Sequence, residues 1–277
     1  MVLQEVKIAA TDSKTQIAVK RVINAPLDSE DEDDNVRPLY DAYFCLPKDK
    51  YNATGFGGKL YGVCTLVRRS LKAINIRNVD WDLEGRVLIC EVPDQARAVF
   101  NVYAVNGTTY DYRNPVTGQV TGNRHDRKRA FHTLLADEAK NYEEKGWSVV
   151  IAGDINISRS TIDSFPQLRM GEGHVRNRAD FEKKFIEELG MLDTFRELRG
   201  AERKYSYRPR GKPWGAGGDR VDMVLVSKGL RGSLKEADIL DDEVARGPSD
   251  HVPLYLVLGC VERQVKGSEN QDECGDE

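Results

Sequence analysis

Short apolar stretches recur along the whole chain, and each has the length and the Val, Leu, Ile and Tyr content that are typical of a β-strand. We therefore expect a strand over each of them. The stretches are YGVCTLV (61–67), RVLICEV (86–92), AVFNVYAV (98–105), SVVIAGDI (148–155), RVDMVLVS (220–227) and VPLYLVL (252–258).

Two longer segments show the period of a helix instead. Residues 126–145 place alanine and leucine side chains on one face, and Gly146 follows as a C-cap. Residues 178–189 place Phe181, Phe185 and Leu189 on one face, and a glycine follows them too. With many strands, few helices and no regular alternation of the two, the pattern predicts an α/β fold with two packed sheets and helices outside.

Composition adds three limits to this picture. Hydrophobic residues make up 40% of the 277 residues and charged residues 31%, which is ordinary for a soluble globular protein. No apolar run approaches the ~20 residues of a membrane span, and MVLQEVKIAA lacks the pattern of a secretory signal. The five cysteines form no CxxC pair, which argues against a zinc site and favours free thiols in an intracellular, reducing compartment.

Charge is distributed unevenly, although the net charge is only −4. This acidic balance weakens a nucleic-acid-binding hypothesis, but basic clusters keep it open. We expect one domain over residues 1–260 and a flexible acidic tail over residues 261–277. The acidic segments are DSEDEDD (28–34) and SENQDECGDE (268–277), and the basic ones are VRR (67–69), NRHDRKR (123–129) and RKYSYRPRGK (203–212).

Polar residues stand where several of these stretches begin or end, and rigid strand ends are where functional sites tend to sit. Asp154 and Asn156 follow a buried strand, and their side chains would share one face because the period of a strand is two. A carboxylate and an amide offer oxygen ligands to a hard cation, but the same pair is common in an Asx turn. The whole set is Glu5, Tyr103, Asn106, Asp154, Asn156, Arg220, Asp222, Asp250 and His251.

The other motifs also have structural readings of their own. Asp250 could orient the imidazole of His251 and raise its basicity, or the pair could form a turn before a strand. Arg220 and Asp222 enter an apolar strand, where a structural ion pair would make their charges tolerable. Tyr103 could lie in the core or reach a phosphate. No motif is decisive alone.

Taken in order, LQE, LEGR, NVYAVNG, GDINIS, DRVDMVLVS and SDHVP resemble the exonuclease III branch of the endonuclease/exonuclease/phosphatase superfamily, which includes the apurinic/apyrimidinic endonucleases. The resemblance runs from residue 1 to about residue 258 and includes WDLEGRVLICEV (81–92), NRADFEKKFIEELGMLDTFREL (177–198) and YSYRPRG (205–211). It implies a four-layer α/β sandwich of two mixed sheets flanked by helices. Family members begin with a strand that carries Trp-Asn-x-Asn-Gly, so we expect this first strand to be missing here.

The resemblance implies a site for Mg²⁺ or Mn²⁺. Glu5 would be the principal metal ligand, and Asp154, Asn156, Asp250 and His251 would complete the site. Mg²⁺ prefers oxygen ligands and keeps several waters, which fits carboxylates and an amide better than a Cys/His set.

The resemblance also implies roles in catalysis and substrate binding. Asp154 would orient or deprotonate the attacking water, while Asn156 and His251 would contact the scissile phosphate. Asp222 would orient the imidazole, and Tyr103 would bind the phosphate or help the leaving group. Substrate-binding candidates are Asn106, Arg124, Arg127, Tyr207, Arg208 and Arg220, and the basic residues expected at the rim are Arg124, Arg127, Arg208, Arg210 and Lys212.

The implied function is Mg²⁺-dependent phosphodiester cleavage in DNA by a monomeric apurinic/apyrimidinic endonuclease with 3′-end processing activity. A role in DNA repair would place the protein in the nucleus, with the cytoplasm as the alternative. Two other functions stay open. One is a phosphatase or phosphodiesterase of the same fold that acts on phosphoinositide, RNA or another phosphodiester, because PWGAGGDRVDMVL (213–225) also resembles the 5-phosphatases. The other is a non-catalytic nucleic-acid-binding remnant.

Overall fold

The computed structural model describes residues 1–25, 38–52, 61–71 and 74–259. A mixed six-stranded sheet forms its centre, in the order β11-β13-β9-β6-β5-β4. The central pair, β6 and β9, is parallel, and the other neighbours in this sheet are antiparallel. The strands are β4 (Asn75–Asn78), β5 (Val87–Val92), β6 (Arg97–Tyr103), β9 (Ser148–Asp154), β11 (Leu192–Asp193) and β13 (Asp222–Val226).

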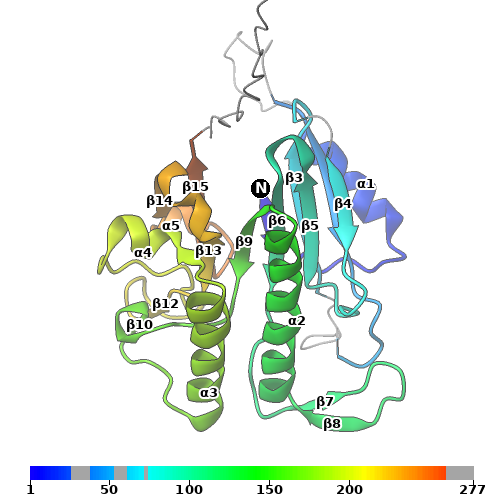
Figure 1. Ribbon diagram of the computed structural model, residues 1–277. Coiled ribbons are helices and arrows are strands. Elements are labelled where there is room, and N and C mark those ends of the chain that lie inside the picture. Colours follow the sequence, from blue (N-terminus) through cyan, green and yellow to red (C-terminus); the bar gives the residue numbers. More distant parts are fainter. Residues whose placement is uncertain (26–37, 53–60, 72–73, 260–277) are drawn as a thin grey trace, which may run out of the picture.

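Helices cover one face of this sheet. Helices α2 (Arg124–Glu144) and α3 (Glu172–Phe181) run next to each other (Figure 1). Side chains that alternate along the central strands, such as Phe100 and Ile151, pack with Phe131 of α2 in the largest hydrophobic core. This alternation follows from the two-residue period of a strand, and it leaves the next side chain along each strand for the opposite face.

Two smaller sheets cover that opposite face. One has the order β1-β3-β2, and the other pairs β14 with β15. Val150 and Val224 of the central sheet pack against Val2 and Leu254 of the smaller sheets. These strands are β1 (Val2–Gln4), β2 (Tyr40–Cys45), β3 (Val63–Arg68), β14 (Leu234–Ile239) and β15 (Leu254–Leu258).

The remaining elements are short and lie around these layers. They are α1 (Ser13–Val22), α4 (Thr194–Arg199), α5 (Glu243–Arg246), β7 (Asp111–Arg113), β8 (Val120–Asn123), β10 (Ser164–Phe165), β12 (Gly218–Asp219), 3₁₀ turns at Pro93–Gln95, Thr161–Asp163 and Lys228–Ser233, and a π-helical segment at Glu182–Glu188. None of the described helices is both long and apolar enough to cross a membrane.

The structure confirms the predicted α/β class of fold, with packed sheets and outer helices. Each of the six predicted strands is present. The helix predicted over residues 126–145 is α2, which begins two residues earlier and ends one residue earlier than predicted. The acidic segment 28–34 and the tail 261–277 lie outside the described residues.

Candidate active site

Three polar side chains form a row across the end of the central sheet. Asp154, the last residue of β9, is the register partner of Tyr103 in β6 and of Asp222 in β13. Register partners on neighbouring strands point to the same side of the sheet, at close distance. The row lies on the side of the smaller sheets, and all three residues are buried. The fold therefore brings together residues that are far apart in the sequence.

The Gly-Asp-x-Asn segment forms a tight turn after β9. The backbone N–H of Asn156 donates to Asp154 Oδ1 at 2.8 Å, and its side-chain Nδ2 donates to Asp154 Oδ2 and to the carbonyl of Ala104, each at 3.0 Å. Asn156 has φ 55° and Gly153 has φ 139°, and a Cβ at Gly153 would collide with the carbonyl of Val102. The segment therefore forms an Asx turn and can also serve the site, because the turn fixes the carboxylate of Asp154.

His251 is bound to the row through Asp222. Its Nδ1 lies 2.7 Å from Asp222 Oδ2, and its ring lies 5.3 Å from that of Tyr207. Burial would lower the pKa of His251, but Asp222, with Asp154 and Asp250 behind it, raises that pKa to about 10. At neutral pH the ring is therefore an imidazolium, with Nδ1–H donated to Asp222 and Nε2–H left to serve the site.

The carboxyl group of Asp154 has a strongly raised pKa. Burial and then the neighbouring Asp222 raise its pKa to about 7, while His251, the Asn156 amide and Lys128 act in the opposite direction. The side-chain ligand atoms of Asp154, Asp222 and His251 all lie within 4.8 Å of one another. A carboxyl with a pKa near neutrality in a cleft is typical of a catalytic acid or base.

Glu5 reaches the row from the loop after β1. The phenol of Tyr103 donates to Glu5 Oε1 at 2.6 Å, and Lys7 Nζ lies 3.1 Å from Glu5 Oε2. Burial raises the pKa of Tyr103 well above its usual value, and Glu5 and Asp154 add to this, although Arg86 opposes them. The phenol therefore stays protonated and acts as a donor.

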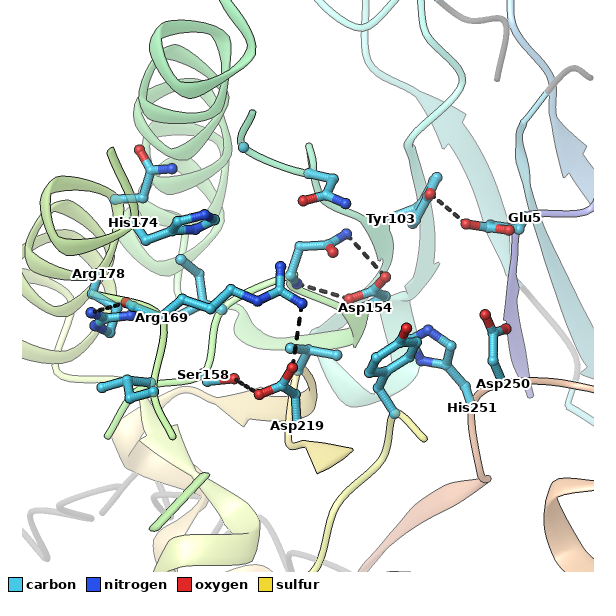
Figure 2. A pocket seen from close by; sticks show the side chains of 18 residues that line it. Glu5, Tyr103, Asp154, Ser158, Arg169, His174, Arg178, Asp219, Asp250 and His251 are labelled. Atoms are coloured by element: carbon cyan, nitrogen blue, oxygen red, sulfur yellow. Dashed lines mark hydrogen bonds and ion pairs between the residues drawn. The ribbon is translucent and has the colours of Figure 1, made fainter. Parts of the chain in front are cut away.

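These residues open into one cavity of about 250 Å³. Figure 2 shows Glu5, Asp154, Asp250 and His251 on its carboxylate-rich side, with Arg169 reaching in from the opposite side. Asn106, Asn156 and Tyr207 also line the cavity. The structure thus brings together the predicted metal ligands and the predicted catalytic residues, with Asp222 directly behind His251.

Comparison with known proteins agrees with this geometry. A model of the Endonuclease/Exonuclease/phosphatase family matches residues 1–251. The chain belongs to this family. The predicted recognition is confirmed, and with it the class of enzyme, a phosphodiester hydrolase.

Two curated members of the family are similar in sequence. Exodeoxyribonuclease III of Haemophilus influenzae is 26% identical over 213 residues, which are 70% of this chain and 75% of that protein. DNA-(apurinic or apyrimidinic site) endonuclease 2 of Saccharomyces cerevisiae is 25% identical over 184 residues, which are 51% of this chain but only 34% of that protein.

Two solved structures of the family share the fold. An AP endonuclease from Archaeoglobus fulgidus has a TM-score of 0.65 at 20% identity, with 93% of this chain and 87% of that chain covered. A 3′ phosphatase from Neisseria, bound to a product DNA hairpin, has a TM-score of 0.66 at 20% identity, with 94% and 88% covered.

Two arginines that were predicted to bind substrate are structural in this member of the family. Arg220 is fully buried, and its guanidinium contacts Asp163 at 2.6 Å and Asp193 at 2.8 Å. Arg208 is also buried and forms a two-pronged ion pair with Asp241 at 2.6–2.9 Å. Their charges are used inside the protein, so the predictions that they bind substrate were wrong.

The predicted basic rim needs a further correction. Arg124 and Arg127 both bind the buried carboxylate of Glu84, at 2.8 Å and 3.0 Å, and neither lines the cavity. Arg210 is exposed and lies 3.7 Å from Asp250, at the edge of the cavity, and Lys212 is exposed beyond it. Among these five candidates, only Arg210 has an ion pair with a residue of the site.

The opposite side of the cavity is formed by residues that no sequence motif had indicated. Arg169, His174, Arg178 and Asp219 line it, and three of them come from residues 166–178, which carry neither an apolar period nor a recognisable motif. The only signal was compositional, since this segment holds three arginines and a histidine within ten residues.

Proposed function

We propose that this chain is a metal-dependent phosphodiesterase that cleaves DNA, as an apurinic/apyrimidinic endonuclease with 3′-end processing activity. The observation that carries the proposal is the buried row of Tyr103, Asp154 and Asp222. Tyr103 and Asp154 open into one cavity together with Glu5 and His251, and Asp222 holds His251 from behind. The row combines a carboxyl of raised pKa with an imidazolium. That is the pairing which phosphodiester hydrolysis requires for moving a proton and for compensating charge.

The donor set of the cavity fits a hard divalent cation. Glu5, Asp154 and Asp250 supply carboxylate oxygens, and the side-chain oxygen of Asn156 adds an amide, which suits Mg²⁺ or Mn²⁺. Burial first and the carboxylate of Asp222 second raise the pKa of Asp154, and a divalent cation beside these two carboxylates would offset their repulsion. His251 was predicted as a further ligand, and this stays a prediction; in the present proposal its ring serves the phosphate, since its Nδ1 is held by Asp222. When bound, such a cation would polarise the phosphoryl oxygens and offset their charge.

The residues of this chain then have distinct tasks. Asp154, fixed by two N–H donors of Asn156, accepts a proton from the attacking water. His251 donates its Nε2–H to a non-bridging phosphate oxygen, and Asp222 keeps the ring oriented and charged. The protonated phenol of Tyr103 is a donor for a phosphate or leaving oxygen once it is released from Glu5.

DNA is favoured as substrate by the curated relatives, whose names describe a deoxyribonuclease and an abasic-site endonuclease. The same relatives disfavour phosphoinositide. The convergence of the expected catalytic residues disfavours a non-catalytic remnant. A monomeric state and an intracellular, nuclear location remain part of this proposal.

The proposal is tested by single-turnover cleavage of three labelled substrates: a duplex with one abasic site, a duplex with a 3′-phosphate, and an intact duplex, with a phosphoinositide assayed beside them. Cleavage should require Mg²⁺ or Mn²⁺ and should stop in EDTA. Asp154→Asn and His251→Ala should each lose at least about 10²-fold in rate. Glu5→Ala should raise the Mg²⁺ concentration that is needed, because it removes a ligand rather than the base.

The matched control is Asp137→Asn, on the exposed side of α2, which should cleave at the parental rate. Cleavage that continues in EDTA, or an Asp154→Asn variant as fast as Asp137→Asn, would contradict the mechanism. Turnover of the phosphoinositide but of no DNA substrate would replace the proposed substrate.

A further inference from the structure

The cavity has two sides of opposite charge, and the proposed mechanism uses only one. The carboxylates of Glu5, Asp154 and Asp250 lie on one side. Arg169 and Arg178 lie on the other, and they come from residues 166–171 and from helix α3 (Figure 2). A phosphodiester at the carboxylate side leaves this cationic side free to contact another part of the substrate.

Arg169 is placed for binding an anion in the cavity. Its side chain is 58% exposed, and the one ion pair that the structure gives it is loose, with Nη2 at 3.4 Å from Asp219 Oδ2. Asp219 already accepts from the hydroxyls of Ser164 at 2.6 Å and Ser158 at 3.3 Å. The planar guanidinium therefore keeps donors for a phosphate, with which arginine forms two parallel hydrogen bonds.

Arg178 fixes the backbone that carries this arginine. Its Nη2 donates to the carbonyl of Arg169 at 2.8 Å and approaches Met170 Sδ at 3.7 Å. The contact ties residues 166–171 to helix α3. The second arginine thus positions the first and adds its own charge to the same side of the cavity.

The surroundings of His174 show that this side is electropositive. Burial lowers the pKa of His174, and the basic groups around it, which are those of His125, Arg169, Arg178 and Lys128, lower it further. Its ring packs edge-to-face on that of His125, with centroids 5.0 Å apart. A group whose charged neighbours all oppose protonation lies in a positive potential, and the same potential attracts an anion.

We propose that Arg169, His174 and Arg178 form a second phosphate subsite, which binds a phosphate next to the scissile one on the same strand. This inference rests on the proposed nuclease function and narrows its substrate to a strand with consecutive phosphates. The subsite positions the strand and carries no sequence information, as is usual for phosphate contacts. A lone phosphomonoester would leave it empty.

The first test combines a variant with a modified substrate. Arg169→Ala should raise KM for a fully charged substrate about tenfold or more, as expected for loss of a hydrogen bond to a charged group. In two further substrates a neutral methylphosphonate replaces the phosphate on the 5′ or the 3′ side of the scissile bond. On one of these the parent and the variant should have equal KM. Equal losses on all three substrates, or no loss on any, would overturn the subsite.

The matched control is Arg69→Ala. Arg69 is 52% exposed and paired with Asp41 at 3.0 Å, at the end of β3 and outside the cavity. The Arg69→Ala substitution removes the same charge as Arg169→Ala, from a side chain of similar exposure. It should match the parent on all three substrates, and a tenfold loss there would mean that general charge, rather than the subsite, sets KM.

A second test does not need turnover. The pKa of the His174 ring is followed by NMR in EDTA, with and without thymidine 3′,5′-bisphosphate. The bisphosphate should raise that pKa in the parent and should have no effect in Arg169→Ala. If cleavage fails but this shift is present, the nuclease proposal is wrong and the subsite stands. If cleavage succeeds but no shift occurs, the subsite is wrong.

Discussion

Replacement of one buried lysine should show how the Asp154–Asn156 turn is held. Lys128 lies in α2 with only 1% of its surface exposed. Its Nζ donates to the carbonyl of Val105 at 2.7 Å and to the carbonyls of Ile155 and Asn156, each at 3.0 Å. Asn156 has the unfavourable φ of 55°, and the charged donor bound to its carbonyl holds the turn in this conformation. Lys128→Met removes the donors and keeps most of the volume.

The magnitude follows from the contacts. Hydrogen bonds from a charged donor contribute about 1.5–3 kcal/mol each, so three of them give roughly 4.5–9 kcal/mol. The substitution also removes the cost of burying an ammonium, which is several kcal/mol. The difference predicts a loss of about 1–3 kcal/mol in the free energy of unfolding. Cleavage should fall as well, because a misplacement of about 1 Å in a site can cost about 10²-fold in rate.

The assay is urea unfolding followed by circular dichroism at pH 6, because burial lowers the pKa of Lys128 to about 7 and the ammonium is then charged. The control, Lys140→Met, makes the same change at an exposed position of the same helix, where the lysine lies 3.8 Å from Glu144. It should stay within about 0.5 kcal/mol of the parent. If Lys128→Met is as stable as Lys140→Met and cleaves at the parental rate, the ammonium does not hold the turn.

Three further predictions concern buried charges. Arg220→Met should lower the free energy of unfolding by about 3 kcal/mol, which is the low end for a broken buried ion pair. The loss stays at this low end because Arg159 and Arg196 still bind Asp193 and Asp163. Chemical denaturation measures it, with the exposed Arg169→Met as control, and two variants as stable as the parent would contradict the prediction. Burial lowers the pKa of His132 to about 4, so the folded state binds its proton less tightly than the unfolded state. The contribution of neutral His132 to the free energy of unfolding is complete above about pH 6.5 and is lost as the pH falls toward 4, by about 3 kcal/mol in total. His132→Gln should lack this part of the acid dependence of stability. Identical pH profiles of the parent and the variant would refute the assignment. Asp154→Asn should raise the melting temperature at pH 8 without metal. The pKa of Asp154 in the folded state is about 7, so its ionisation costs stability as the pH rises from about 4 to 7. A lower melting temperature would show that the hydrogen bonds of Asp154 outweigh the cost of its charge.

The positions of the strands, and the residues at their ends, could be predicted because local chemistry specifies them. A short apolar stretch that is rich in β-branched and aromatic residues favours a buried strand. A carboxylate at the end of such a strand must face either a partner or a cavity. Glu5, Asp154, Asp222 and Asp250 all followed this rule. Which strands are neighbours did not follow from local pattern, since the register of Asp154 with Tyr103 and Asp222 is a tertiary property.

The arginines could not be sorted by the same reasoning. Arg220 and Arg208 stand in motifs, whereas Arg169 stands in none, yet Arg169 is the one that lies in the cavity. A guanidinium can neutralise a carboxylate inside the protein or a phosphate outside it, and the sequence around it is compatible with both. Only the partners decide: Asp163, Asp193 and Asp241 use two of these charges internally, and Asp219 leaves the third largely free.

Burial of unlike and like charges in one row explains why this end of the sheet is suited to a reaction. Asp154 and Asp222 are adjacent register partners, and burial together with the charge of Asp222 raises the pKa of Asp154. His251 contacts Asp222 directly, and the hydrogen bonds of the buried Lys128 go to backbone carbonyls, although the charges of both cations also lower the pKa of Asp154. The pKa of Asp154 nevertheless stays raised, at about 7, so these groups offset the cost of ionising this buried carboxyl only in part. A protein selected only for stability would not keep a carboxyl with such a cost at that position. In the proposed mechanism a bound cation offsets this cost and links the carboxyl to the phosphate.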